Sequence, residues 1–160
     1  MYGSLVEQYK IVRGCTATAM NATVTLDNVS LKNVNKAWIV IQLSNATGKA
    51  VVINPLLGTS VATCATAITF SAKYWSNADT SSTDTLVANT AGTTLTVSSA
   101  ATPAMHVVEI DPAAVAAQGA TYDCLGCTIT GGSNAGDYAS AIYVLEMRYP
   151  QATPPAAITD

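Results

Sequence analysis

The chain has 160 residues, which suits a single domain, and its hydrophobic content of 49% is enough to fill a core. Charged residues make up only 11%, against roughly 25% in an ordinary soluble domain, and the net charge is −3. Seven basic residues and no apolar run near the roughly 18–20 residues that span a bilayer argue against nucleic-acid-binding and membrane-spanning proteins. A surface with so few charges indicates that part of it is covered in an assembly.

Charge is divided unevenly along the chain. Residues 1–78 carry six basic and two acidic residues, whereas residues 79–160 carry one basic and eight acidic residues. If the two halves form different faces, this asymmetry favours docking onto an acidic partner or head-to-tail contact. Interleaved strands would instead mix the two signs.

The first half of the chain reads as strands that follow an N-terminal arm of about residues 1–14. This segment has no apolar signal-peptide core, so we expect synthesis in the cytoplasm. Strands are predicted at 8–12, which Gly14 ends, and at 22–26. The segment 36–43 (KAWIVIQL) is apolar on both faces, so we expect a central strand that is covered on both sides. A turn at 45–48 favours a hairpin with the next strand, 49–53, which Pro55 and Gly58 close.

The second half continues in the same way. In the predicted strand 65–75, Ile68, Phe70, Ala72 and Tyr74 share one face, and a polar, exposed and mobile loop follows at 76–84. Asp111 as cap, Pro112 at the first helical position and Gly119 at the end predict one short helix. Further strands are expected at 85–88, 93–98, 105–110, 122–130 and 141–149.

About eight to ten short strands with turn residues between them predict an all-β fold. We expect an antiparallel β-sandwich, jelly-roll-like, with one short helix. Residues 1–149 would form this single domain, and residues 150–160, with Pro154 and Pro155, an extended C-terminal tail.

The four cysteines leave three interpretations open. The Cys124–Cys127 spacing resembles half of a zinc site, but Cys15 and Cys64 lie far apart in the sequence with no histidine near them. Residues three apart in a strand point to opposite faces, so a Cys124–Cys127 disulfide would need a bulge. Buried free thiols are the interpretation that the sequence favours, and a disulfide formed after release from the cell is the alternative.

Other chemistry-bearing residues give weak signals. His106 is the only histidine and lies within a strand pattern, and no nucleophile elbow accompanies it, so we favour a packed or surface histidine and no enzymatic activity. Asn77, Asp79 and Asp84 could hold Ca²⁺ in their loop, but turn solvation is favoured because no glycine pivot or bidentate glutamate is present. We therefore expect no metal and no cofactor.

Several segments together resemble the small decoration, or cement, proteins of tailed double-stranded DNA bacteriophages. The resemblance covers roughly residues 36–160 and is one of strand texture. It rests on residues 48–53 (GKAVVI), 61–63 (VAT), 70–79 (FSAKYWSNAD), 84–86 (DTL), 107–112 (VVEIDP), 122–124 (YDC) and 141–149 (AIYVLEMRY).

This resemblance implies a structural virion protein on the capsid exterior that bridges and stabilises major capsid protein subunits. Its partners would be the major capsid protein and copies of itself, as a dimer or trimer, with no direct nucleic-acid or membrane contact. The expected capsid-contact residues lie in the arm: Tyr2, Leu5, Tyr9, Lys10 and Arg13.

Two other functions stay open at this point. A head fibre, spike, or carbohydrate- or receptor-binding module would need an exposed aromatic beside a polar loop, and Trp75 next to 77–84 is the candidate. A hydrolase would depend on His106.

Overall fold

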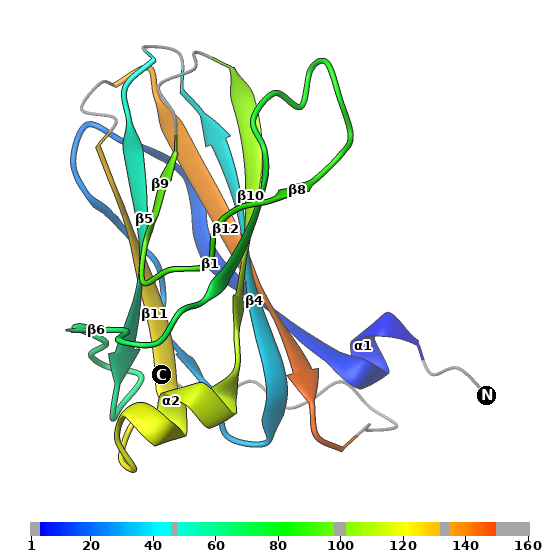
Figure 1. Ribbon diagram of the computed structural model, residues 1–160, viewed down its shortest axis with the longest axis vertical. Coiled ribbons are helices and arrows are strands. Elements are labelled where there is room, and N and C mark those ends of the chain that lie inside the picture. The colour runs from blue at the N-terminus through cyan, green and yellow to red at the C-terminus, as the bar shows by residue number, and fades with distance from the viewer. Residues whose placement is uncertain (1–3, 46–47, 98–101, 132–134, 150–160) are drawn as a thin grey trace.

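The structure is a computed structural model that describes residues 4–45, 48–97, 102–131 and 135–149. Within these residues, two antiparallel sheets pack against each other (Figure 1), which confirms the predicted all-β sandwich. The predicted Pro-rich tail, residues 150–160, lies outside the described residues.

Each sheet contains strands from both halves of the chain. Sheet A has the order β1 (Tyr9–Ala19), β12 (Tyr138–Met147), β4 (Val34–Ser44), β10 (Pro103–Ile110), β7 (Lys73–Asn77) and β8 (Val87–Ala88). Sheet B has the order β2 (Val24–Thr25), β11 (Cys124–Thr130), β5 (Val51–Gly58) and β6 (Thr66–Ala67), with β3 (Val29–Ser30) beside β11 and β9 (Leu95–Val97) beside β5. Two helices, α1 (Leu5–Gln8) and α2 (Pro112–Gln118), complete the described elements.

The strand order is that of a jelly roll. The central sheet-A order β1-β12-β4-β10 and the sheet-B order β2-β11-β5-β6 interleave early and late strands. Most connections cross from one sheet to the other, and β2–β3, β5–β6 and β7–β8 stay within a sheet. This arrangement matches the two Greek keys of a double-sheet jelly roll.

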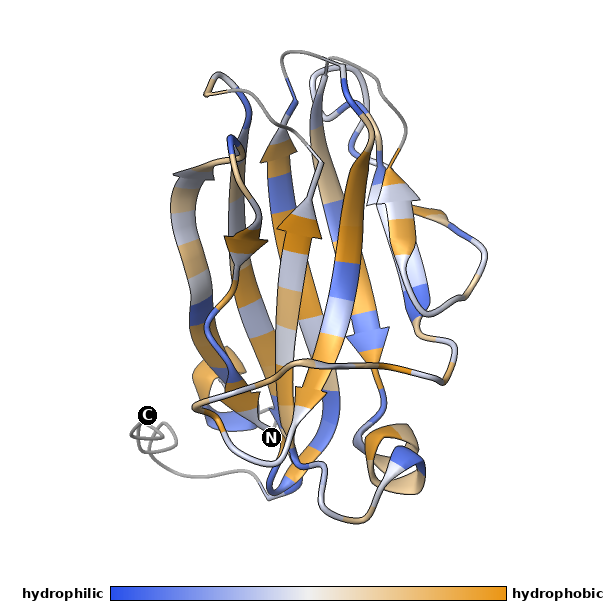
Figure 2. Ribbon diagram, turned by 90° about the vertical axis from the view of Figure 1, so that its left-hand side faces the viewer, coloured by the Kyte–Doolittle hydropathy of each residue, from blue (hydrophilic) through white to orange (hydrophobic). Residues whose placement is uncertain are grey.

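The core lies between the sheets and is built by period-two alternation. In β4, Ala37, Ile39, Ile41 and Leu43 point inward and are buried, while the residues between them point outward. The strands in Figure 2 show the same alternation of hydrophobic and polar colours. Because each fully buried aliphatic side chain contributes about 1.5–3 kcal/mol, this alternation decides which face of every strand turns inward.

The predicted central strand is present and longer than expected, but the described chain covers only one of its faces, whereas the sequence analysis expected cover on both. β4 pairs with β10 on one side and β12 on the other, over Val34–Ser44 instead of 36–43. Its partners come from the last third of the chain, so the centre of sheet A closes through long-range pairing.

Two predictions for this part of the chain are wrong. β4 and β5 do not form a hairpin, because β4 belongs to sheet A and β5 pairs with β11 in sheet B. Pro55 does not close β5, which continues to Gly58; residues 54–55 lie between the parts of β5 that pair with β9 and with β6. A proline is tolerated there because no neighbouring strand needs its missing N–H on that side.

The predicted strand 65–75 is divided between the two sheets. Its first part is β6 in sheet B, and its last part lies in β7 of sheet A. The predicted inward residues are nevertheless right: Ile68, Ala72 and Tyr74 are buried, and Phe70 packs partly against the core. The alternation of apolar and polar residues predicts which side chains are buried, but it does not predict whether the segment passes from one sheet to the other.

Gly14 does not end β1, as the sequence analysis expected. The strand continues to Ala19, with register shifts against β12 on both sides of Cys15. A Cβ on Gly14 would lie 3.1 Å from the Leu26 side chain and 3.2 Å from the Ala141 carbonyl oxygen. Glycine fits at this position because the neighbouring strand and the core leave little room for a side chain.

The helix ends follow local chemistry. In α2 the Asp111 side chain accepts a hydrogen bond from the Ala113 N–H at 2.8 Å, with Pro112 in the first turn and Gly119 at the C-cap, which confirms the predicted helix. The sequence analysis did not predict α1, where the Ser4 N–H donates to Glu7 Oε2 at 2.6 Å. The Ser-x-x-Glu spacing of a capping box was present as a signal.

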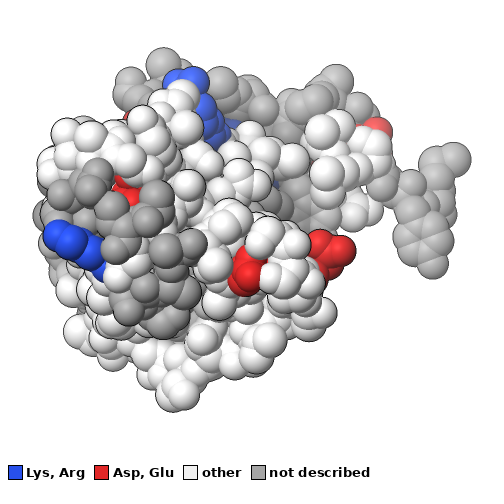
Figure 3. All heavy atoms as spheres, turned by 90° about the horizontal axis from the view of Figure 1, so that it is seen from above, with Lys and Arg blue, Asp and Glu red and all other residues white. Residues whose placement is uncertain are grey.

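The charge asymmetry along the sequence disappears in space. Lys32 pairs with Asp123 at 3.2 Å, and Lys36 and Lys73 each approach Glu109 at 3.4 Å, so each pair joins a base of the first half to an acid of the second. Seen from above (Figure 3), the few charged side chains are scattered over a mostly uncharged surface. The interleaved strands mix the two signs, as one of the two interpretations predicted.

Candidate functional site: an apolar sheet face

Sheet A carries hydrophobic side chains on its outer side as well as on its core side. Register aligns outward residues of five neighbouring strands in rows: one row contains Ile11, Val144 and Trp38, and the next contains Ile142, Val40, Val107 and Trp75. Met105 lies one step further along β10. We call these eight residues the apolar face.

The described chain leaves this face open. Ile11 is 46% exposed and Ile142 is 40% exposed, and the other six members are half-buried. Each of the eight positions covers about 4.8 Å across the strands and about 7 Å along them, so the apolar face has an area of roughly 300 Å². An apolar patch of this size is often functional in a monomeric protein. The outer side of an antiparallel sheet is commonly polar, whereas here apolar residues occupy its middle and charged residues such as Arg13, Glu109 and Lys73 lie at the ends of the two rows.

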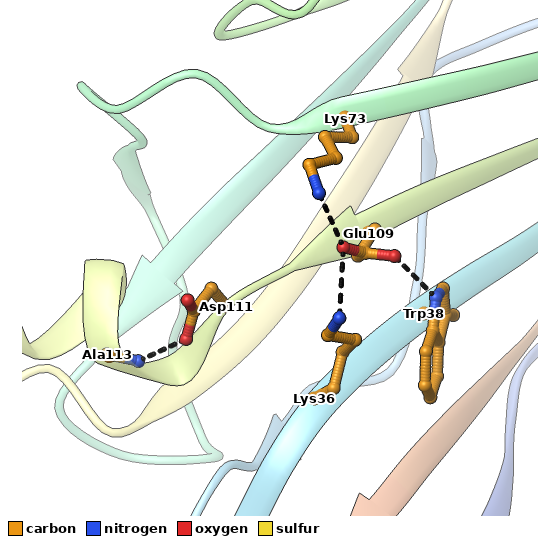
Figure 4. A network of polar contacts seen from close by, with 6 residues as sticks. All are labelled: Lys36, Trp38, Lys73, Glu109, Asp111 and Ala113. Carbon is orange, nitrogen blue, oxygen red and sulfur yellow. Dashed lines mark hydrogen bonds and ion pairs between the residues drawn. The ribbon is translucent and has the colours of Figure 1, made fainter. Parts of the chain in front are cut away.

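A polar cluster borders one end of the apolar face (Figure 4). Trp38 Nε1 donates to Glu109 Oε2 at 3.1 Å, and the two lysine Nζ atoms of Lys36 and Lys73 lie 3.4 Å from Glu109 Oε1. Burial of the Glu109 carboxyl acts to raise its pKa, but the Trp38 hydrogen bond and the two lysine charges outweigh burial, so the pKa is lowered. Tyr9 lies against Trp38 with ring centroids 6.2 Å apart, so edge strand β1 is tied into this cluster.

A groove of about 670 Å³ borders the opposite end of the apolar face. Its floor is the ends of β4, β10 and β12, and its wall includes Thr80 and Asp84 from the loop between β7 and β8, which projects at the upper right of Figure 1. Tyr138 is the exposed aromatic residue in the groove, opposite Ser44 of β4. The groove therefore combines one aromatic ring with several polar side chains.

The loop that walls this groove has internal hydrogen bonds. The Asn77 side-chain amide donates to the Thr83 carbonyl at 2.5 Å, and the Thr80 N–H donates to the Pro103 carbonyl at 2.9 Å. Hydrogen bonds from the Ser81 and Ser82 hydroxyls lower the pKa of the Asp79 carboxyl. These hydrogen bonds engage the Asn77 amide and the Asp79 carboxylate within the loop.

The structure disperses the capsid-contact residues expected from the sequence. Tyr2 lies outside the described residues, and Leu5 is exposed on α1, which projects at the lower right of Figure 1. Tyr9 and Arg13 point to the outer side of sheet A, Arg13 next to Ile142. Lys10 lies opposite the core residue Leu145, so it belongs to the inner side of the edge strand. Tyr9 and Arg13 thus flank the apolar face, and Leu5 lies on the helix that precedes it.

Apart from the two-sided strand 36–43 and Trp75, sequence reasoning did not identify the residues that form the apolar face. The signal was present in the outward positions of 36–43, 105–110 and 141–149, where Val40, Val107, Ile142 and Val144 take the place of polar residues. The candidate aromatic Trp75 is half-buried in the apolar face, and Tyr138, not Trp75, is the aromatic residue in the groove.

The single histidine is packed in the core. His106 is 1% exposed, and its Nδ1 lies 2.7 Å from Ser76 Oγ, which also accepts a hydrogen bond from Asn89. Desolvation by burial lowers the pKa of His106 to about 4, so the ring is neutral at pH 7. Its Nε2 has no hydrogen-bond partner within the described residues.

All four cysteines are free thiols. The described residues contain no group of three or more His, Cys, Asp or Glu side chains placed to hold a metal ion. As β11 alternation requires, Cys127 packs in the core whereas Cys124 does not belong to the core cluster.

Comparisons with known proteins do not place the chain in a family: no family model, no curated protein and no solved structure matches it. Among the described helices, neither is long and apolar enough to cross a membrane.

Proposed function

We propose that this chain is a structural virion protein that binds the outer surface of a tailed-phage capsid, where it bridges and stabilises major capsid protein subunits. The observation that supports this proposal is the apolar face. β4 has the two-sided hydrophobicity of a strand covered on both faces, yet the described chain covers only one of them. A partner surface would supply the second cover, and burial of roughly 300 Å² at about 25 cal/mol per Å² gives each contact a gross gain of about 7 kcal/mol before association costs.

The position of β1 and α1 fits the same role. β1 is an edge strand of sheet A, and α1 exposes Leu5 and Val6 immediately before it. An arm that contacts one subunit while the apolar face contacts its neighbour would bridge the two. Linked contacts of this kind raise overall affinity by about 10²–10⁴ over a single contact.

The test is co-sedimentation with expanded capsids of the source phage that lack this protein. Val40→Lys places a charge in the centre of the apolar face, and Thr96→Lys places the same charge on an exposed position of β9 in sheet B. We expect Val40→Lys to lose capsid binding and Thr96→Lys to retain it, with both variants folded by circular dichroism. Equal binding by Val40→Lys and the wild type, or by a variant without the N-terminal arm, would contradict the proposal.

A second candidate function, carbohydrate binding, is favoured by the groove beside Tyr138. An exposed aromatic ring beside amide, hydroxyl and carboxyl groups is the combination that fixes a polar ligand with apolar faces. A glycan array that shows binding abolished by Tyr138→Ala would support it. Binding abolished by Trp75→Ala but not by Tyr138→Ala would place the ligand on the apolar face instead of in the groove.

A further inference from the structure

Two cysteines distant in the sequence meet on the outer side of sheet B. In β11, Leu125, Cys127 and Ile129 belong to the core cluster, so Cys124 points away from the core. Cys124 is nevertheless only 3% exposed. A part of the chain outside the sheet must therefore cover it.

The cover is the turn between β5 and β6, which folds back over the sheet and brings Cys64 with it. A Cβ built on Gly58 would lie 2.8 Å from Cys64 Sγ, and one built on Gly126 would lie 2.9 Å from Cys64 Cβ. The missing side chains of these two glycines create the hollow that Cys64 occupies.

Cys124 borders the same hollow. Gly58 is its cross-strand partner, and Gly126 is the next residue on the same face of β11. Side-chain positions directly opposite in an antiparallel pair are about 4.5–5.5 Å apart. The Cys64 sulfur, placed against Gly58, therefore lies on the same face of sheet B as the Cys124 side chain and next to it.

Backbone and side-chain hydrogen bonds hold both cysteines in this position. The Ala65 N–H donates to the Leu57 carbonyl at 3.1 Å, and the Asp123 N–H donates to the Gly58 carbonyl at 3.2 Å. The residues next to the two cysteines are therefore anchored to consecutive residues of β5. Asn28 Nδ2 donates to the Val61 carbonyl at 2.9 Å, which fixes the tip of the turn.

We propose that Cys64 and Cys124 form a disulfide bond under oxidising conditions, which fastens the β5–β6 turn to β11. The two thiols lose two protons and two electrons to a disulfide oxidant such as oxidised glutathione, which is reduced to two glutathione thiols. One cysteine thiolate first attacks oxidised glutathione, which forms a mixed disulfide and releases one glutathione thiol. The second cysteine thiolate then attacks the protein sulfur of this mixed disulfide and releases the other glutathione.

The other cysteines do not compete for this pairing. Cys127 points to the opposite side of β11 from Cys124. Cys15 lies in sheet A, and two packed sheets are about 10 Å apart, beyond the roughly 7 Å Cα separation that a disulfide bridges.

The bond would form late and slowly. Desolvation by burial raises the pKa of the Cys64 thiol to about 11 and that of Cys124 to about 12, so reactive thiolate is scarce at pH 7. The two thiols stay reduced in a reducing cytoplasm, and they form the disulfide after the protein is released from the cell. Disulfide formation is faster at higher pH because more thiolate is present. This inference does not depend on the proposed function.

The experiment exposes the full-length protein to oxidised glutathione at pH 8.5, blocks remaining thiols, and maps disulfides by mass spectrometry without reduction. We expect a Cys64–Cys124 cross-link and a rise in Tm of roughly 5–10 °C that dithiothreitol reverses. Chymotryptic cleavage after Leu125 separates Cys124 from Cys127.

Matched serine variants complete the test. Cys64→Ser and Cys124→Ser should each abolish the Tm rise, and Cys15→Ser should keep both the cross-link and the rise. Mapping in the wild type remains decisive if a variant does not fold. Three results for the wild type would overturn the inference: both thiols still react with the alkylating agent, the two cysteines carry only glutathione adducts, or a different pair of cysteines forms the disulfide.

Discussion

His106 makes the stability of this protein depend on pH in a range where few other side chains titrate. Its ring is buried, and burial lowers its pKa from 6.5 to about 4. As the pH falls, the His106 ring of the unfolded chain therefore takes up a proton near pH 6.5, whereas that of the folded chain does so only near pH 4. The stabilisation is fully present above pH 6.5 and is lost as the pH falls through this window.

The magnitude follows from the two pKa values. Between pH 7 and pH 5 the free energy of unfolding should fall by about 2 kcal/mol, and the full loss near pH 4 is about 3 kcal/mol. Because the chain has one histidine, we assign the change in the free energy of unfolding between pH 7 and pH 5 to His106. Carboxylates contribute mainly below that range.

Urea denaturation at pH 7, 6 and 5, followed by tryptophan fluorescence, measures this change. His106→Gln removes the titrating group, so its free energy of unfolding should be nearly constant over the same range, whatever its absolute stability. A wild type with equal stability at pH 7 and pH 5 would refute the buried, neutral state of this ring.

Three smaller predictions concern stability at neutral pH, each measured by urea denaturation. Glu109→Gln removes the carboxylate that holds two partly exposed lysines and should cost about 1 kcal/mol, and less at high salt; a salt-independent loss would contradict an ionic origin. Gly58→Ala would place a Cβ 2.2 Å from the Thr63 carbonyl oxygen and should cost about 1–3 kcal/mol, whereas Gly92→Ala, whose nearest atom is 3.5 Å away, should change stability little. Asp111→Ala removes the N-cap of α2 and should cost about 1 kcal/mol, and an unchanged stability would mean that this cap is dispensable.

Local sequence determined the burial pattern, the central strand and one helix. The alternation at Ile68 and Tyr74 predicted inward side chains correctly although the segment changes sheets, because alternation depends only on neighbouring residues. The capping order from Asp111 to Gly119 predicted α2 for the same reason. Each of these features is determined by residues that are close together in the sequence.

Only the tertiary structure decided which strands pair and which surfaces stay open. A turn after β4 looks the same whether the chain returns in the same sheet or crosses to the other, so the hairpin prediction failed. The apolar face needs five strands in register, and the position of Cys64 beside β11 needs the hollow over Gly58. Both depend on residues brought together from across the chain by long-range pairing, which no local pattern of side chains encodes.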